Sequence, residues 1–66
     1  MTQPSGEDVE EELVYIASFY ADMLRRKYEE WRKKRTPEAR REFEKGAELL
    51  LESASALVRF LKARKG

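Results

Sequence analysis

Residues 33–40 read Lys-Lys-Arg-Thr-Pro-Glu-Ala-Arg, and this stretch decides the fold because it stops one helical pattern and starts another. Thr36 is a preferred residue at a helix N-terminal cap, where its hydroxyl accepts a hydrogen bond from a free backbone N–H. Pro37 suits the first helical position, which needs no N–H donor, and Glu38 favours the positive end of a helix dipole. The sequence therefore predicts that a helix begins at Pro37.

Outward from this break, apolar residues recur at helical spacing in both directions. We expect a first helix at about residues 7–34 and a second at about 37–65. Residues 1–6 are expected to form a short flexible arm, followed by a single hairpin domain at 7–66. Such a short link forces the helices to be antiparallel neighbours. The predicted fold class is therefore all-α, a two-helix antiparallel hairpin.

The distribution of charge agrees with this hairpin. The first helix opens with the acidic stretch 7–12 and closes with the basic stretch 32–35, and the second opens with Glu38 and Glu42 and closes with several Lys and Arg. Each helix thus carries charges that complement its own dipole. The antiparallel arrangement also sets the acidic start of one helix against the basic end of the other.

The chain is too small to build a large core. It has 66 residues and neither Cys nor His, so disulfides are excluded and the usual thiolate and imidazole ligands of zinc are missing. Below roughly 70–80 residues a single core rarely supplies more than about 3–5 kcal/mol. We therefore expect no metal and no cofactor, and we expect stability to come from association.

The charge balance and the N-terminus exclude several classes of partner. The chain has 14 Lys and Arg against 13 Asp and Glu, a net charge of +1, which gives no broad attraction for nucleic acid or anionic lipid. The longest uncharged stretch, 13–21, is far shorter than the roughly 20 residues of a membrane span. The N-terminus lacks the basic start and apolar run of a signal peptide. We expect a soluble protein, cytoplasmic if expressed in a cell, with no targeting signal and no membrane partner.

The apolar residues cover more of each helix than a single partner can bury. They span roughly 220° of each circumference, whereas a surface helix of a globular domain needs a little over about 100°. The first helix carries two adjacent heptad seams, which is typical of a helix inside a multi-helix bundle. One seam contains Val9, Leu13, Ile16, Tyr20 and Met23, and the other contains Val14, Ala17, Ala21, Leu24, Tyr28 and Trp31. The residues expected at the core or interface of an assembly are Leu13, Ile16, Tyr20, Leu24, Trp31, Phe43, Leu50, Leu57 and Leu61.

These wide apolar surfaces predict a self-assembling structural protein whose partners are copies of itself. A cyclic homo-oligomer is preferred, with a hexamer favoured and an octamer or a dimer open. The dimer would be a two-fold four-helix bundle. Two alternatives remain: a helical module that presents its apolar face to a foreign protein, and a monomeric hairpin that stays partly molten.

No enzyme is expected, and no small-molecule substrate. The serines have no histidine to activate them, and the carboxylate pairs lie in charged runs typical of solvated helix faces. The basic stretch 25–35, interleaved with Tyr28 and Trp31, could suggest nucleic acid. Glu29 and Glu30 interrupt it, however, and a helix C-terminus favours cations in any case. We therefore expect no nucleic-acid partner.

The two helices differ in the size of their apolar side chains. The first is rich in aromatic residues, whereas the second holds Gly46 and several Ala and Ser. A glycine inside a helix costs roughly 1 kcal/mol relative to alanine, so we interpret Gly46 as a point of close helix approach. In a ring of hairpins the inner helices crowd together, and small residues therefore place the second helix inside.

As a whole, the chain resembles de novo designed helical hairpins. The resemblance rests on the turn 36–40, the matched helix lengths, the dipole-directed charges and the absence of His and Cys. It implies a cyclic bundle with two concentric layers of helices, similar to designed water-soluble hexameric or octameric pore scaffolds. Tyr15 and Gly46 depart from the idealised pattern of that family.

A ring with the second helix inside would enclose a water-filled channel. The candidate lumen-lining residues are Arg41, Glu48, Glu52, Ser55, Arg59 and Lys62. Symmetry turns each charged member into a ring of like charges, which is tolerable only in water and which governs ion passage. The same stripe could instead be a solvated outer face. The first helix offers a competing stripe, composed of Glu11, Tyr15, Ser18, Asp22, Arg25 and Glu29.

Overall fold

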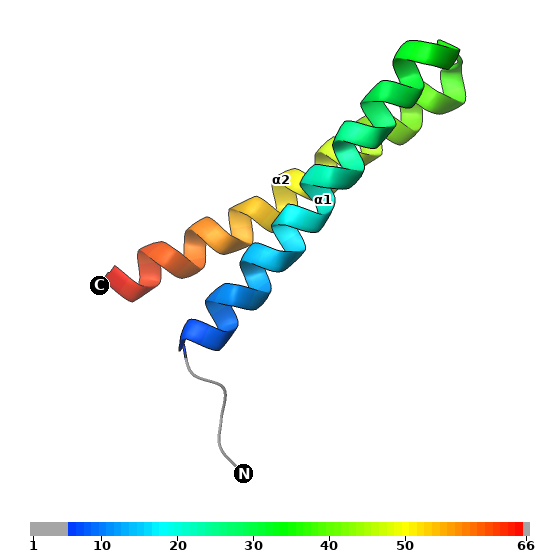
Figure 1. The fold of residues 1–66 in the computed structure, drawn as a ribbon. Coiled ribbons are helices and arrows are strands. Elements are labelled where there is room, and N and C mark those ends of the chain that lie inside the picture. Colours follow the sequence, from blue (N-terminus) through cyan, green and yellow to red (C-terminus); the bar gives the residue numbers. More distant parts are fainter. Residues whose placement is uncertain (1–5, 66) are drawn as a thin grey trace.

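The computed structural model describes residues 6–65, which form two antiparallel α-helices (Figure 1). Helix α1 spans Gly6–Lys34 and helix α2 spans Pro37–Lys65, each with 29 residues. No strand occurs in residues 6–65. The predicted all-α hairpin is confirmed. Helix α1 begins at Gly6, a residue that we had assigned to the arm, and the rest of that arm lies outside the described residues.

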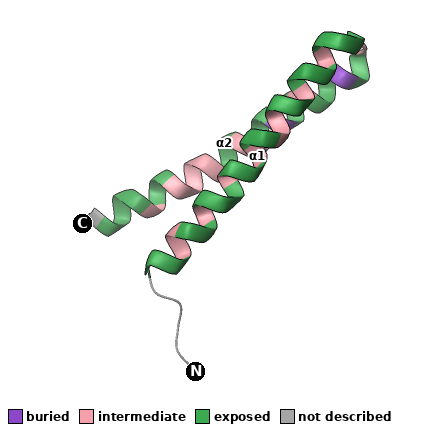
Figure 2. Cartoon of the chain, in the orientation of Figure 1, coloured by how far each residue is buried: buried purple, intermediate pink, exposed green. Residues whose placement is uncertain are grey.

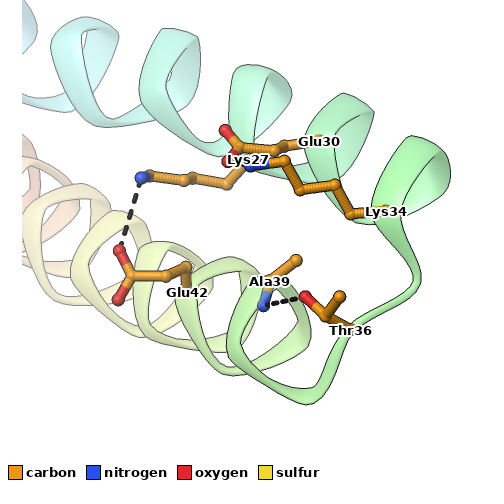
Figure 3. A network of polar contacts seen from close by, with 6 residues as sticks. All are labelled: Lys27, Glu30, Lys34, Thr36, Ala39 and Glu42. Carbon is orange, nitrogen blue, oxygen red and sulfur yellow. Dashed lines mark hydrogen bonds and ion pairs between the residues drawn. The ribbon is translucent and has the colours of Figure 1, made fainter.

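The turn between the helices has the geometry that its sequence predicts. The backbone N–H of Ala39 donates to the Thr36 hydroxyl at 3.1 Å, which caps helix α2 (Figure 3). The N–H of Arg40 donates to the Thr36 carbonyl at the same distance, 3.1 Å, as the first backbone bond of the helix. Ala39 itself is buried against the turn, with 6% of its surface exposed. A capped, Pro-initiated start therefore fixes where α2 begins.

Helix α1 ends on an unusual residue. Arg35 adopts a left-handed conformation with φ of 53°, and its N–H donates to the Trp31 carbonyl at 2.9 Å. Helices commonly end this way, but usually on a glycine, because a side chain in this conformation costs roughly 1–2 kcal/mol. The Arg35 guanidinium lies over the Trp31 ring, 5.2 Å from its centroid, and this contact offsets part of the cost.

Replacing Arg35 by glycine should raise the free energy of unfolding by roughly 0.5–1 kcal/mol, because the left-handed strain is larger than the lost contact with Trp31. Arg35→Ala is the matched control: it keeps the strain and loses the contact, so it should be less stable than the parent chain. Urea unfolding at one fixed protein concentration measures both variants. A glycine variant as unstable as the alanine variant would contradict this account.

Polar pairs join the two helices near both ends of the hairpin. Lys27 Nζ lies 3.3 Å from Glu42 Oε1 (Figure 3), and Arg64 Nη1 lies 2.8 Å from Glu10 Oε1 at the open end. All four side chains are substantially exposed, so each pair contributes about 0–1 kcal/mol. These pairs set the register of the helices more than they stabilise them.

The face of α1 that meets α2 lies between the two predicted seams. The residues along this face are half-buried and follow one another at spacings of three and four: Glu10, Leu13, Ala17, Tyr20, Leu24, Lys27 and Trp31. Each predicted seam thus supplies part of the contact, and two charged residues lie along it. The remaining apolar residues of both seams point to either side of the hairpin.

Candidate functional site

The hairpin only half-covers the residues predicted for the core. Seven of the nine are half-buried between the helices: Leu13, Tyr20, Leu24, Trp31, Phe43, Leu50 and Leu57. Ile16 and Leu61 are exposed, at 37% and 39%. Figure 2 shows that most of both helices is exposed or half-buried. Within residues 6–65, no hydrophobic side chain larger than that of Ala39 is buried.

Several large hydrophobic side chains are more than two-fifths exposed. Besides Ile16 and Leu61, the exposed ones are Val14, Tyr15, Phe19, Tyr28, Leu51 and Val58, with exposed fractions from 44% to 71%. Single exposed hydrophobic residues are ordinary, but a contiguous set of them marks an interaction surface.

The total surface area supports the same conclusion. A compact monomer of 7.8 kDa exposes roughly 4,400 Å² by the usual scaling, whereas this chain exposes 5682 Å². When the six residues outside 6–65 are subtracted at their fully extended surface, and the compact reference is reduced to the remaining residues, the excess is roughly 700 Å². A standard protein interface covers about 800 Å² on each partner. The hairpin therefore has surplus surface close to that of one interface.

The contacts between the helices show which residues lie on which side. A Cβ built on Gly46 lies 3.7 Å from the Leu24 Cα, so these two residues face each other across the seam. Counting about 100° per residue from this pair assigns every other residue to one side of the hairpin or the other. The Lys27–Glu42 ion pair falls on one side. The contact of the Tyr28 and Phe43 rings, whose centroids are 5.4 Å apart, falls on the opposite side.

We call the first side the Phe19 edge. Its exposed apolar residues, Ile16 and Phe19, come from α1, and half-buried Met23 lies beside them. A shallow hollow here is lined by Phe19, Met23, Arg26, Lys27 and Glu30. Half-buried Leu49 and Ala56 of α2 lie on the same side, so the exposed apolar residues of this edge come from α1 while α2 adds partly covered ones.

We call the opposite side the Val58 edge, and both helices contribute to it. Its exposed apolar residues are Val14, Tyr28, Leu51, Val58 and Leu61. A mostly apolar hollow on α2 is lined by Leu51, Ala54, Ser55, Val58 and Arg59. Small Ala54 lies between the larger side chains, so the surface dips there in a depression that is wider open than the one at the Phe19 edge.

The six candidate lumen residues form one stripe on α2. Counting from Gly46, Arg41, Glu48, Glu52, Ser55, Arg59 and Lys62 all lie roughly 120° or more from the seam. Ser55 is half-buried and the other five are exposed. The competing stripe of α1, from Glu11 to Glu29, is likewise exposed and turned away from α2. Each helix thus presents one polar stripe on the side remote from its partner.

The basic stretch 25–35 is largely engaged within the hairpin. The guanidinium groups of Arg35 and Arg40 lie over the Trp31 ring, 5.2 and 5.4 Å from its centroid. Lys34 Nζ donates to Glu30 Oε1 at 3.1 Å, and this ammonium holds the pKa of Glu30 below its usual value, with a smaller effect from Lys27 and Lys33. Trp31 is thus half-buried and in contact with two guanidinium groups.

Gly46 is buried where the two helices lie close together, in keeping with our interpretation of this residue. An added Cβ would lie 3.5 Å from Leu24 Cδ1 and 3.9 Å from Met23 Cε, both ordinary van der Waals distances. The site therefore accepts a methyl group but has little room for more.

Replacing Gly46 by alanine should raise the free energy of unfolding by roughly 0.5–1 kcal/mol, through the higher helix propensity of alanine. Gly46→Leu should instead destabilise the hairpin, because its larger side chain must push Leu24 and Met23 aside at a cost of typically 1–3 kcal/mol. Thermal unfolding followed by circular dichroism ranks the three chains. A leucine variant as stable as the alanine variant would show that the helices are not in close contact here.

In the part of the chain that the structure describes, no group of three or more Asp, Glu, His or Cys is placed to hold a metal ion. Neither helix is long and apolar enough to cross a membrane over those same residues. Comparison of the chain with models of protein families, with curated proteins and with solved structures gives no match.

Proposed function

We propose that this chain is a self-assembling structural protein whose hairpins associate into a cyclic homo-oligomer. The observation that carries the proposal is the pair of uncovered apolar edges on opposite sides of one hairpin. Burial of apolar surface is worth about 25 cal/mol per Å². The exposed apolar side chains of the two edges, among them Phe19, Leu51 and Val58, therefore supply a driving force for association beside the small core of the hairpin.

Association with copies of itself explains the surface better than one foreign partner does. A helix that docks in a groove covers one side of its receptor, and here the second edge would remain in water. A ring covers both edges of every copy, and it closes without leaving a free end. The hexamer remains our favoured size, with the octamer next, and the turn and charge pattern support a designed origin.

A central channel is the finer part of the proposal. With α2 inside, the stripe that contains Glu48, Glu52 and Arg59 would face the symmetry axis, and the small residues of α2 would suit the crowded inner layer. Charged rings need water around them, so the lumen would be open rather than dry. A structure of the assembly tests this: an axis lined by α1, or filled with Leu and Phe, would contradict it.

Sedimentation equilibrium without any partner tests the assembly itself. We expect a mass several times 7.8 kDa at micromolar concentration, together with high helicity. A monomer would overturn the proposal. A monomer that is folded and gains a complex only with a foreign helix would favour the binding-module alternative.

A further inference from the structure

We infer that the hairpins join in a single direction, with the Phe19 edge of each copy packed into the Ala54 hollow on the Val58 edge of the next copy. This inference rests on the proposed self-assembly and specifies which surfaces meet. The occupant of the hollow is thus a second copy of this chain, and its anchoring side chain is Phe19. This contact would cover Ser55 and Arg59, which line the hollow, and of the candidate lumen stripe it leaves Arg41, Glu48, Glu52 and Lys62 to face a channel.

The unequal composition of the two edges favours such a head-to-tail contact. A two-fold contact pairs a surface with itself. Pairing the Val58 edge with itself would set one hollow against another, and it would leave Phe19 54% exposed. Pairing the Phe19 edge with itself would leave Leu51 and Val58 in water, at 67% and 46%. Only a contact between unlike edges covers all of these residues with one kind of interface.

The shapes of the two edges also fit one another. The Phe19 ring packs edge-to-face on Tyr20, with centroids 5.5 Å apart and planes at 71°, so a neighbour in its own helix supports it while half of it remains exposed. The hollow opposite has Ala54 between Leu51 and Val58. A large side chain that enters a site made by a small residue and flanked by larger ones is the packing of knobs into holes.

Phe19 and the hollow lie at the same height along the hairpin. The contacts of Glu10 with Arg64 and of Leu24 with Gly46 bracket the middle of the molecule. Phe19 lies between the two α1 residues of these contacts, and residues 51–59 lie between the two α2 residues. A rotation about an axis parallel to the hairpin therefore brings Phe19 to the hollow of the next copy without sliding it. Such a rotation closes into a ring when its angle divides a full turn.

Cysteine cross-linking tests the contact, because the chain has no cysteine of its own. The mass of the parent chain is measured first, and a monomer at that stage overturns the proposed function and this inference together. Phe19→Cys and Ala54→Cys chains are then oxidised, or treated with a short bis-maleimide, separately and as an equal mixture. We expect a covalent dimer with one chain of each kind in the mixture, and none from either variant alone.

A second pair, Met23→Cys with Leu51→Cys, keeps Phe19 in place and should give the same mixed dimer. A single chain carrying Phe19→Cys and Ala54→Cys should form a ladder that ends at the size of the ring. Two results would overturn the inference while leaving self-assembly intact. One is that a single variant links to itself, as a two-fold contact requires. The other is that neither pair gives a mixed dimer although the mixture keeps the parent mass.

Discussion

Replacing Leu57 by aspartate should abolish assembly and most of the helicity together. Leu57 is half-buried between the two helices, and the proposed ring would cover more of it. A carboxylate placed there without a partner costs several kcal/mol, which is comparable with the whole stability of a chain of this size. Leu50→Asp should act in the same way, because Leu50 lies two helical turns before Leu57 on the same face of α2 and is also half-buried.

Circular dichroism and sedimentation, measured on the same sample, check this prediction. We expect both signals to be lost at micromolar concentration, where the parent chain should show both. Lys33→Ala serves as the control, since its side chain is exposed and a surface charge contributes about 0–1 kcal/mol. A Leu57→Asp chain that remains a helical monomer would show that the hairpin folds independently of its assembly.

Local signals in the sequence predicted the hairpin closely. Thr36 and Pro37 act within their own turn, so the start of α2 follows from the preferences of two residues. The end of α1 was harder to foresee, because Arg35 holds the left-handed conformation that glycine or asparagine would signal. The run of Lys and Arg from 32 to 35 indicated the end of a helix but not its geometry.

The candidate surface was harder to predict than the fold. Because the apolar arc covers roughly 220° of the helix, the sequence does not identify which part of the circumference contacts the other helix. Two adjacent seams were predicted, yet the contact runs between them and includes Glu10 and Lys27. Long charged side chains can lie along a seam when their heads reach water or an opposite charge, and these two pair with Arg64 and Glu42. Gly46 was the useful signal, because it marked a point where the two helices lie close together.

Replacing Val58 by aspartate should dissociate the assembly to a mass near 7.8 kDa. Val58 is 46% exposed in the hairpin and lies beside the Ala54 hollow, so only a neighbouring copy would bury the new carboxylate, at a cost of several kcal/mol. Tyr15→Asp is the matched control. Tyr15 is more exposed, at 71%, and it lies on the outer stripe of α1, on the side remote from α2 and one helical turn from Phe19.

The comparison separates the edges from general hydrophobicity. If any exposed apolar residue drove association, Tyr15→Asp would dissociate the chain at least as much as Val58→Asp, because more of its surface is available to a partner. If the edges are the interface, Tyr15→Asp should dissociate the chain less than Val58→Asp, since its carboxylate lies at the margin of the Phe19 edge and not against the Ala54 hollow. Sedimentation of both variants at one concentration measures the difference. Equal dissociation of the two would remove the argument that association runs through opposite edges of the hairpin.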